Sequence, residues 1–325
     1  MIRFLKYSIV GSLVLFLAVA FFIVRFLYKN DAPIISGDVE RGVPYKNDLK
    51  LDIYFPTKKV FEKSPVVLYL HGGAWIRGSK DAINFNRFNG AVNTLRDGGY
   101  TIIAPDYSLA GKTKTVFPDC ILDVYDAIEW VKSSASKYEL DPGNIGLLGE
   151  SAGAHIAMMV AFSPTTLQPE IYNKTRFNYL IDVYGPNDLT DVYRGKTLEK
   201  IDSTLKRVSK IFGSEFNIKE YVFGFDPSKD SVRAGELLNK FSPINVIEKT
   251  RMPVLVIHGK SDQIVPVHQS VTLKQKMDEL GISNEIHLMD SVDHNFRKAS
   301  REQLDSVQTW ISDFVMRSYI GDRPK

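Results

Sequence analysis

Cysteine is almost lacking in this chain, because Cys120 is the only one among 325 residues. A single cysteine excludes an intramolecular disulfide and a cysteine-rich metal site. The chain also has almost no net charge outside its amino-terminal segment. Residues 1–30 hold four of the 41 basic residues and no acidic one, so 37 basic residues face 38 acidic ones in the remainder. Without a run of lysine and arginine, the sequence does not indicate a nucleic-acid partner.

Charge is absent from the eighteen residues between Lys6 and Arg25. A helix rises about 1.5 Å per residue, so this run nearly crosses the hydrocarbon core of a bilayer. We therefore predict a single membrane anchor within residues 1–30, with residues 8–28 in the membrane. A buried helix of a soluble protein is less well supported, since no polar face interrupts the run.

A cleaved signal peptide is the alternative for this segment. Ala18-Val19-Ala20 has the small-x-small form of a cleavage site, although apolar residues continue beyond it. Arg3, Lys6 and the free amine slightly favour a cytoplasmic amino terminus. In either case residues 31–325 are predicted to form one domain outside the cytoplasm, in a periplasmic or lumenal compartment.

Repeats and low-complexity tracts are lacking as well, and apolar runs alternate with helical patterns. The runs that predict strands are Leu51–Phe55, Val66–Leu70, Thr101–Ala104, Ile145–Leu148, Tyr179–Val183, Val254–His258 and Glu285–Met289. Apolar positions at helical spacing lie between Cys120 and Val131 and between Leu304 and Phe314. This alternation predicts an α/β fold with a mostly parallel central sheet flanked by helices. Residues 30–43 are predicted to be a linker that enters the first strands.

A stretch of about fifty residues, Leu189–Lys240, has no strand pattern of its own. An amphipathic helical stripe within it comprises Ile201, Leu205, Val208, Ile211 and Phe212, and the aromatic residues Phe216, Tyr221, Phe223 and Phe225 follow. A long insertion that carries its own helix commonly covers a binding site. We therefore predict a helical cap at about residues 189–240; the alternative is an extra helical hairpin on the surface.

The sequence Gly149-Glu150-Ser151-Ala152-Gly153 follows an apolar run directly. It predicts a strand that turns sharply into a helix and exposes the hydroxyl of Ser151 at the turn. The flanking glycines are expected to let the backbone make this turn. Ser151 is therefore a candidate nucleophile, and a glycine-rich turn with an exposed serine is the alternative.

A serine nucleophile needs a base, and His294 is the candidate among six histidines. It lies in a polar loop, Asp290–Phe296, after the last predicted strand and before the final helix. Four others are expected to have structural or peripheral places: His155 on the helix after Ser151, His258 at a strand end where it could support the acid loop, His268 at a helix start and His287 in a strand. His71 belongs to a glycine motif described below.

The base in turn needs a carboxylate that fixes its tautomer. Asp262 follows the penultimate predicted strand directly and is our candidate, although an ordinary turn would also accommodate an aspartate there. Asp290 and Asp293 are rivals. Because Asp293 adjoins His294 in the sequence, its side chain is expected to point elsewhere.

Backbone donors for an oxyanion are expected in His71-Gly72-Gly73-Ala74-Trp75, which follows a predicted strand. Two successive glycines let backbone amides approach a ligand without an intervening side chain. We predict that the amides of Gly72, Gly73 and Ala152 form an oxyanion hole, and a plain turn is the alternative.

Together these motifs resemble those of the α/β-hydrolase superfamily, and more narrowly the HGG-bearing carboxylesterases of the hormone-sensitive-lipase-like and BD-FAE groups. The resemblance covers roughly Leu51 to Phe314 and also rests on Asp106-Tyr107-Ser108-Leu109-Ala110, Phe117-Pro118 and Asp141-Pro142. It implies triad roles for Ser151, Asp262 and His294. The chain departs from the family pattern at Ala74, where a third glycine is usual, at Ser108, where arginine is usual, and at Asn295, where glycine is commoner.

The resemblance implies a serine hydrolase that cleaves carboxylic esters through an acyl-enzyme, and the predicted cap, which would limit the pocket, indicates short to medium acyl groups. A small-molecule ester is then the expected partner, and no metal or organic cofactor is implied. A formamidase or amidase of the kynurenine-formamidase type is one alternative, because the same triad serves both reactions. A non-catalytic ligand-binding protein of this fold is another. The oligomeric state and the acyl and alcohol groups stay open.

Overall fold

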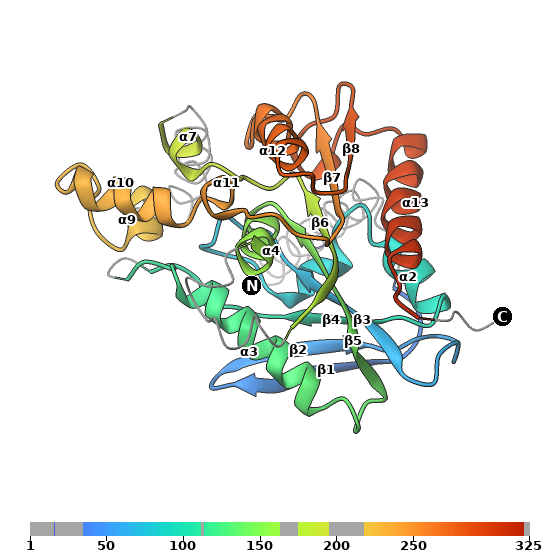
Figure 1. Ribbon diagram of the computed structural model, residues 1–325. Helices are drawn as coiled ribbons and strands as arrows, with labels where there is room; N and C mark the ends of the chain where they lie inside the picture. Colours follow the sequence, from blue (N-terminus) through green and yellow to red (C-terminus); the bar gives the residue numbers. More distant parts are fainter. Residues whose placement is uncertain (1–15, 17–34, 112–113, 163–174, 195–217, 322–325) are drawn as a thin grey trace, which may run out of the picture.

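The computed structural model describes residue 16 and residues 35–111, 114–162, 175–194 and 218–321 (Figure 1). Eight strands form one sheet in the order β1-β2-β4-β3-β5-β6-β7-β8. They are β1 (Val39–Lys46), β2 (Leu49–Tyr54), β3 (Ser64–Leu70), β4 (Thr101–Pro105), β5 (Leu140–Glu150), β6 (Phe177–Val183), β7 (Val254–Gly259) and β8 (Asn284–Met289). Strand β2 pairs antiparallel with β1 and β4, and all other neighbours are parallel. The predicted mostly parallel sheet is confirmed.

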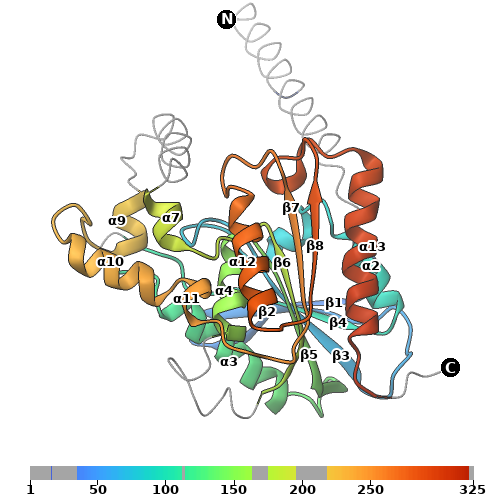
Figure 2. The same cartoon turned by 45° about the horizontal axis from the view of Figure 1, so that its top comes forward.

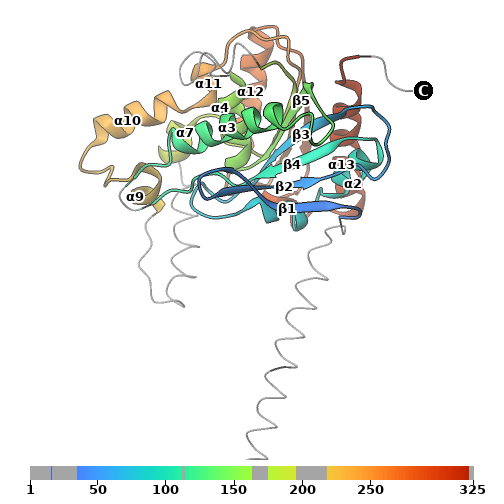
Figure 3. The same ribbon diagram turned by 90° about the horizontal axis from the view of Figure 1, so that it is seen from below.

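Helices cover both faces of this sheet (Figures 1 and 3). On one face lie α3 (Asp119–Ser133), α4 (Ala152–Phe162) and α12 (His268–Glu279), and on the other lie α2 (Gly90–Asp97) and α13 (Arg301–Arg317). Each face has its own cluster of buried apolar side chains. Every residue of β3, β4, β6 and β7 is buried. Burial on both faces is the reason that these strands are unbroken apolar runs in the sequence.

The prediction that residues 30–43 form a linker is wrong for its last part, because β1 begins at Val39. This strand lies at the edge of the sheet and is half exposed, so the alternation of polar and apolar residues is weak. It also contains Pro44 and Gly42, the latter with φ +69° at a break in the pairing register. Proline and glycine are tolerated in edge strands and at bulges, but they hide such a strand from sequence analysis.

Four short helices gather beyond one end of the sheet (Figure 2). They are α7 (Leu189–Arg194), α9 (Ile218–Phe223), α10 (Ser231–Lys240) and α11 (Pro243–Val246). Helix α10 packs against α7, and α11 packs against α4. The three helices α7, α9 and α10 lie within the predicted insertion at 189–240. The apolar stripe from Ile201 to Phe212 and Phe216 lies outside the described residues.

The predicted membrane anchor also lies outside the described residues, apart from Phe16. None of the helices in the part of the chain that the structure describes has the length and apolar character needed to cross a bilayer. The anchor at residues 1–30 therefore stays a prediction.

Candidate active site

The carboxyl ends of the central strands meet at one edge of the sheet, and the predicted site residues follow these ends. Leu70 at the end of β3 is in register with Gly149 of β5, and Glu150 at the end of β5 is in register with Val183 of β6. Val183 is in turn in register with Ile257 of β7. The loops after β3, β5, β6 and β7 therefore emerge side by side.

Ser151 occupies the sharp turn between β5 and α4 and has φ +52°, the left-handed region. Its amide donates to the carbonyl of Val183 at 2.9 Å, which ties the turn to the neighbouring strand end. The flanking glycines do not have positive φ; they permit close packing instead. A Cβ on Gly149 would lie 2.5 Å from the backbone of Ala154, and one on Gly153 would lie 2.1 Å from the carbonyl oxygen of Leu70. The strain of the turn thus resides in the serine itself.

The three predicted triad residues lie in one line of hydrogen bonds. His294 Nε2 lies 3.1 Å from Ser151 Oγ, and His294 Nδ1 lies 2.6 Å from Asp262 Oδ2. When the neutral ring carries its proton on Nδ1, Nε2 accepts a hydrogen bond from the Ser151 hydroxyl and Nδ1 donates one to the Asp262 carboxylate. Asp262 is 4% exposed, and the His294 side chain is 11% exposed. This geometry meets the requirement of a serine nucleophile with a base in reach and an oriented base.

Asp262 is held as an anion by four donors. Its Oδ1 accepts from the amides of Ile264 at 2.7 Å and Val265 at 2.9 Å, and its Oδ2 contacts His258 Nε2 at 3.2 Å as well as His294. Burial alone would raise the pKa of this carboxyl, but the hydrogen bonds from His258 and His294 hold the pKa below its usual value. The acid therefore stays charged over the working range of a serine hydrolase.

His258 supports the acid loop as the sequence suggested. It is fully buried at the end of β7, and its Nε2 also lies 2.9 Å from the carbonyl oxygen of Val265. A carbonyl only accepts, so Nε2 carries the proton and Nδ1 accepts from Ser270 Oγ at 2.7 Å. The imidazole thereby bridges the acid loop and α12.

The rival carboxylates and a second histidine have other partners. Asp293 Oδ1 accepts from the amide of Lys298 at 2.9 Å, and Asp290 pairs with Lys260 at 2.7 Å. His155 is buried, and its Nε2 lies 2.7 Å from the carbonyl oxygen of Phe241. Burial lowers the pKa of His155 to about 4, so its ring stays neutral. The sequence analysis expected this histidine to be structural, which its contacts bear out.

The glycine loop after β3 lies directly beside the nucleophile. A Cβ on Gly72 would lie 3.3 Å from Ser151 Cβ, and one on Gly73, where φ is +134°, would lie 1.9 Å from the carbonyl oxygen of Arg77. Tyr107 holds the start of this loop, because its hydroxyl donates to the carbonyl of His71 at 2.6 Å and the two rings stack at 4.1 Å. A side chain at Gly72 would thus be tight against Ser151, and one at Gly73 would collide with the backbone of its own loop.

The three amides predicted for the oxyanion hole differ in their surroundings. Ala152 is the first residue of α4, and the first amides of a helix have no acceptor within it, so this amide is available to an anion. Gly73 lies in the loop described above. The backbone of Gly72 lies beside Glu150, because a Cβ there would be 3.5 Å from Glu150 Cγ. The oxyanion roles of Gly72, Gly73 and Ala152 all stay predictions.

Two residues next to the triad were not assigned from the sequence. The ring of Tyr184, which follows β6, lies 4.7 Å from the ring of His294, and Glu150 is buried behind Ser151. A carboxylate that ends an otherwise apolar strand is the signal that marks Glu150 in the sequence. No pattern marks Tyr184.

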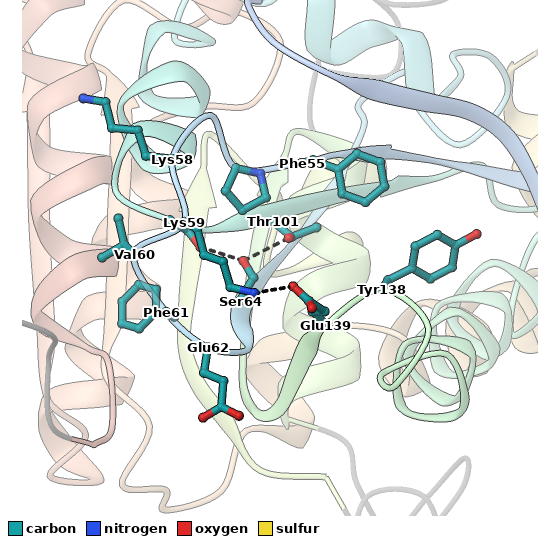
Figure 4. A pocket seen from close by; sticks show the side chains of 12 residues that line it. Phe55, Lys58, Lys59, Val60, Phe61, Glu62, Ser64, Thr101, Tyr138 and Glu139 are labelled. Atoms are coloured by element: carbon teal, nitrogen blue, oxygen red, sulfur yellow. Dashed lines mark hydrogen bonds and ion pairs between the residues drawn. The ribbon is translucent and has the colours of Figure 1, made fainter.

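A surface hollow of about 200 Å³ lies elsewhere (Figure 4). Its lining includes Ser64 and Thr101, which begin β3 and β4, and Lys59, which pairs with Glu139 at 2.8 Å. These are the amino ends of the strands, whereas the triad follows the carboxyl ends. Strand β3 has seven residues and runs from Ser64 to Leu70, which is in register with Gly149 beside the nucleophile; at about 3.3 Å per residue it separates the two sites by roughly 20 Å. The hollow is therefore separate from the triad.

Metal ligands were not expected from the sequence. Across residues 35–111, 114–162, 175–194 and 218–321, no three or more His, Cys, Asp or Glu side chains are grouped so that they could hold an ion.

The mostly parallel sheet, the serine at the turn after β5 and the acid and histidine on later loops define the α/β-hydrolase class. Within this class the chain belongs to the BD-FAE family, whose model matches residues 51–277. It is 27% identical over 242 residues to the "Probable carboxylic ester hydrolase LipM" of Mycobacterium tuberculosis, covering 72% of this chain and 50% of that protein. It is 24% identical over 231 residues to "Esterase LipC" of the same organism, covering 70% and 51%.

The fold has counterparts among solved structures. A "Truncated form of carbohydrate esterase from gut microbiota" superposes with a TM-score of 0.64 at 21% identity, covering 88% of this chain and 99% of that one. At this identity the likeness concerns the fold. The chain spans about half the length of the two M. tuberculosis relatives.

Proposed function

We propose that the protein is a serine hydrolase that cleaves carboxylic esters of short to medium acyl groups. The observation that carries the proposal is the line of contacts from Ser151 Oγ through His294 to Asp262, at 3.1 Å and 2.6 Å. The names of the relatives, which are esterases and a carboxylic ester hydrolase, support the reaction class. They do not favour a formamidase, and an assembled triad does not favour a non-catalytic protein.

In the proposed reaction Ser151 Oγ attacks the acyl carbon while its proton passes to His294 Nε2. The carbonyl electron pair moves to oxygen, where the amides of Gly73 and Ala152 stabilise the negative charge. The tetrahedral intermediate collapses, the C–O bond breaks, and the alcohol leaves with the proton from His294. Water then attacks the acyl-enzyme by the same route and releases the acid, and Ser151 recovers its proton. Asp262 holds His294 and stabilises its charged form throughout.

A limit on acyl length follows from the helices beyond the sheet. Tyr193 of α7 and Phe223 of α9 contact edge to face at 5.0 Å, and Phe223 contacts Phe225 at 5.6 Å. If these helices form the predicted cap, the aromatic cluster closes the acyl side of the site. We expect kcat/KM of the full chain for p-nitrophenyl esters to be highest between acetyl and octanoyl and at least about tenfold lower for palmitoyl. A flat profile across this series would contradict the length limit, and faster turnover of formanilides than of any ester would favour the formamidase.

We also propose that residues 1–30 anchor the protein in a membrane and that the hydrolase domain lies outside the cytoplasm. The charge-free run between Lys6 and Arg25 supports this. We expect the full chain to stay in the membrane pellet after an alkaline carbonate wash, and protease added outside intact cells or sealed vesicles of that orientation to digest the domain. Release into the wash would contradict the anchor. A mature protein that begins at Phe21 would instead identify a cleaved signal peptide.

A further inference from the structure

Glu150 is a buried carboxylate next to the nucleophile that the mechanism above does not use. It ends β5, is 7% exposed, and its Oε2 accepts from the hydroxyl of Tyr184 at 2.7 Å. The hydroxyl of Tyr69 donates to its Oε1, and the backbone of Gly72 lies beside it, because a Cβ on Gly72 would be 3.5 Å from Glu150 Cγ. Two hydroxyl donors and the glycine loop, from three different segments, thus meet at one side chain.

These three neighbours connect Glu150 to both halves of the catalytic apparatus. Gly72 belongs to the glycine loop beside Ser151, and the ring of Tyr184 contacts the ring of His294 at 4.7 Å. Tyr184 has φ +48°, a conformation that needs support, and its hydroxyl bond to Glu150 supplies such support. The Glu150 carboxylate therefore fixes the Gly72 loop on one side and the Tyr184 ring, which contacts His294, on the other.

Two hydroxyl donors at Glu150 suit a carboxylate, which only accepts. Burial raises the pKa of this carboxyl above its usual value, although the bonds from Tyr69 and Tyr184, the backbone of Gly72 and the charge of His294 oppose that rise. The titratable groups that face it are Tyr69 and Tyr107 from the β3 and β4 side, Tyr184 after β6 and His294 on its loop. Burial raises the pKa of all three tyrosines well above its usual value, so they stay neutral donors. Glu150 is the anion of this group.

We propose that Glu150 is a positioning residue of the hydrolase: it fixes the Gly72 loop and Tyr184, and its charge stabilises the imidazolium that forms on His294 during acylation. The inference rests on the proposed function. Glu150 is then a second carboxylate near His294, separate from Asp262. It acts on His294 through the Tyr184 ring and through the electrostatic effect of its charge. Because such a group acts on the transition state, its loss should affect kcat more than KM.

Glu150→Gln in the full chain tests this. Glutamine keeps the shape, but its amide nitrogen cannot accept from a hydroxyl or an amide, so one donor loses its partner and the charge is gone. We expect kcat for a short-chain ester to fall about 10- to 100-fold with KM changed less than about threefold. We also expect the acid limb of the kcat/KM profile to move to lower pH, because the imidazolium loses a stabilising charge. Glu139→Gln, at an exposed residue just before β5 that pairs with Lys59, is the matched control and should change neither.

A second variant keeps the test decisive if Glu150→Gln does not fold. Tyr184→Phe keeps the ring against His294 and removes one bond to Glu150, and we expect a severalfold fall in kcat with an unmoved acid limb. Unchanged kcat and pH profile in the folded Glu150→Gln variant, or unchanged kcat in Tyr184→Phe, overturns the inference. If the parent neither hydrolyses esters nor reacts with a fluorophosphonate, the proposed function has failed instead.

Discussion

Replacing Ser151 with alanine is expected to lower kcat for ester hydrolysis by about four to six orders of magnitude, a range typical of serine hydrolases that lose the nucleophile. Alanine keeps the Cβ that packs against Gly72, and the amide that bonds to Val183, so the turn should survive. What disappears is the oxygen that lies 3.1 Å from His294 Nε2. The measurement is kcat and KM for a p-nitrophenyl ester, beside covalent labelling with a fluorophosphonate.

The labelling experiment separates a chemical effect from a structural one. The parent protein should be labelled and the Ser151→Ala variant should not, while both unfold at the same temperature. Ser133→Ala is a suitable control, since that hydroxyl only bonds to the carbonyl of Trp130 within its own helix, α3. Full turnover in Ser151→Ala would show that the reaction does not pass through this serine. A folded parent that is not labelled would mean that the nucleophile is not activated.

The fold could be predicted from the sequence where burial on both faces imposes an unbroken apolar run. Strands β3, β4, β6 and β7 are of this kind, and each was found within three residues of its bounds. Strand β1 was missed because this edge strand is partly exposed without a regular alternation and contains Pro44 and Gly42. Thus the apolar pattern that identifies a strand is imposed by the elements that bury it, and β1, which has only one neighbouring strand, is buried too little to show the pattern.

The site was predictable to the extent that its residues follow strand ends. Ser151, Asp262 and His294 each stand in a loop after an apolar run, and the meeting of parallel strands at one edge brings them together. The bonds of Glu150 were not predictable, because Tyr69 and Tyr184 lie 81 and 34 residues away from it in the chain. The role of the glycines at the turn was also misjudged. Their lack of a side chain allows α4 to pack close to β3 and β5. This packing requirement involves segments far apart in the chain and is not visible in the local sequence.

Replacing Asp262 with asparagine is expected to lower kcat by about four orders of magnitude without unfolding the protein. If the amide oxygen keeps its bonds to the amides of Ile264 and Val265, then the NH₂ group faces His294 Nδ1. That nitrogen must then accept, so the proton moves to Nε2, the nitrogen that faces the nucleophile. A ring protonated there cannot take the hydroxyl proton of Ser151.

The opposite orientation of the asparagine is no better. Its NH₂ group would then face two backbone N–H groups, and two donors facing each other in a buried site are strongly unfavourable. In the first orientation the NH₂ group also faces His258 Nε2, which lies 3.2 Å from Asp262 Oδ2, but that N–H keeps the carbonyl of Val265 at 2.9 Å as an acceptor. The variant is therefore driven to the first orientation and to the wrong tautomer. Asp293→Asn is the matched control, because Asp293 adjoins His294 but accepts only from the amide of Lys298, and its kcat should stay within about threefold of the parent. If Asp293→Asn lost as much activity as Asp262→Asn, or if Asp262→Asn kept a tenth of the parent rate, the assignment of the acid would be wrong.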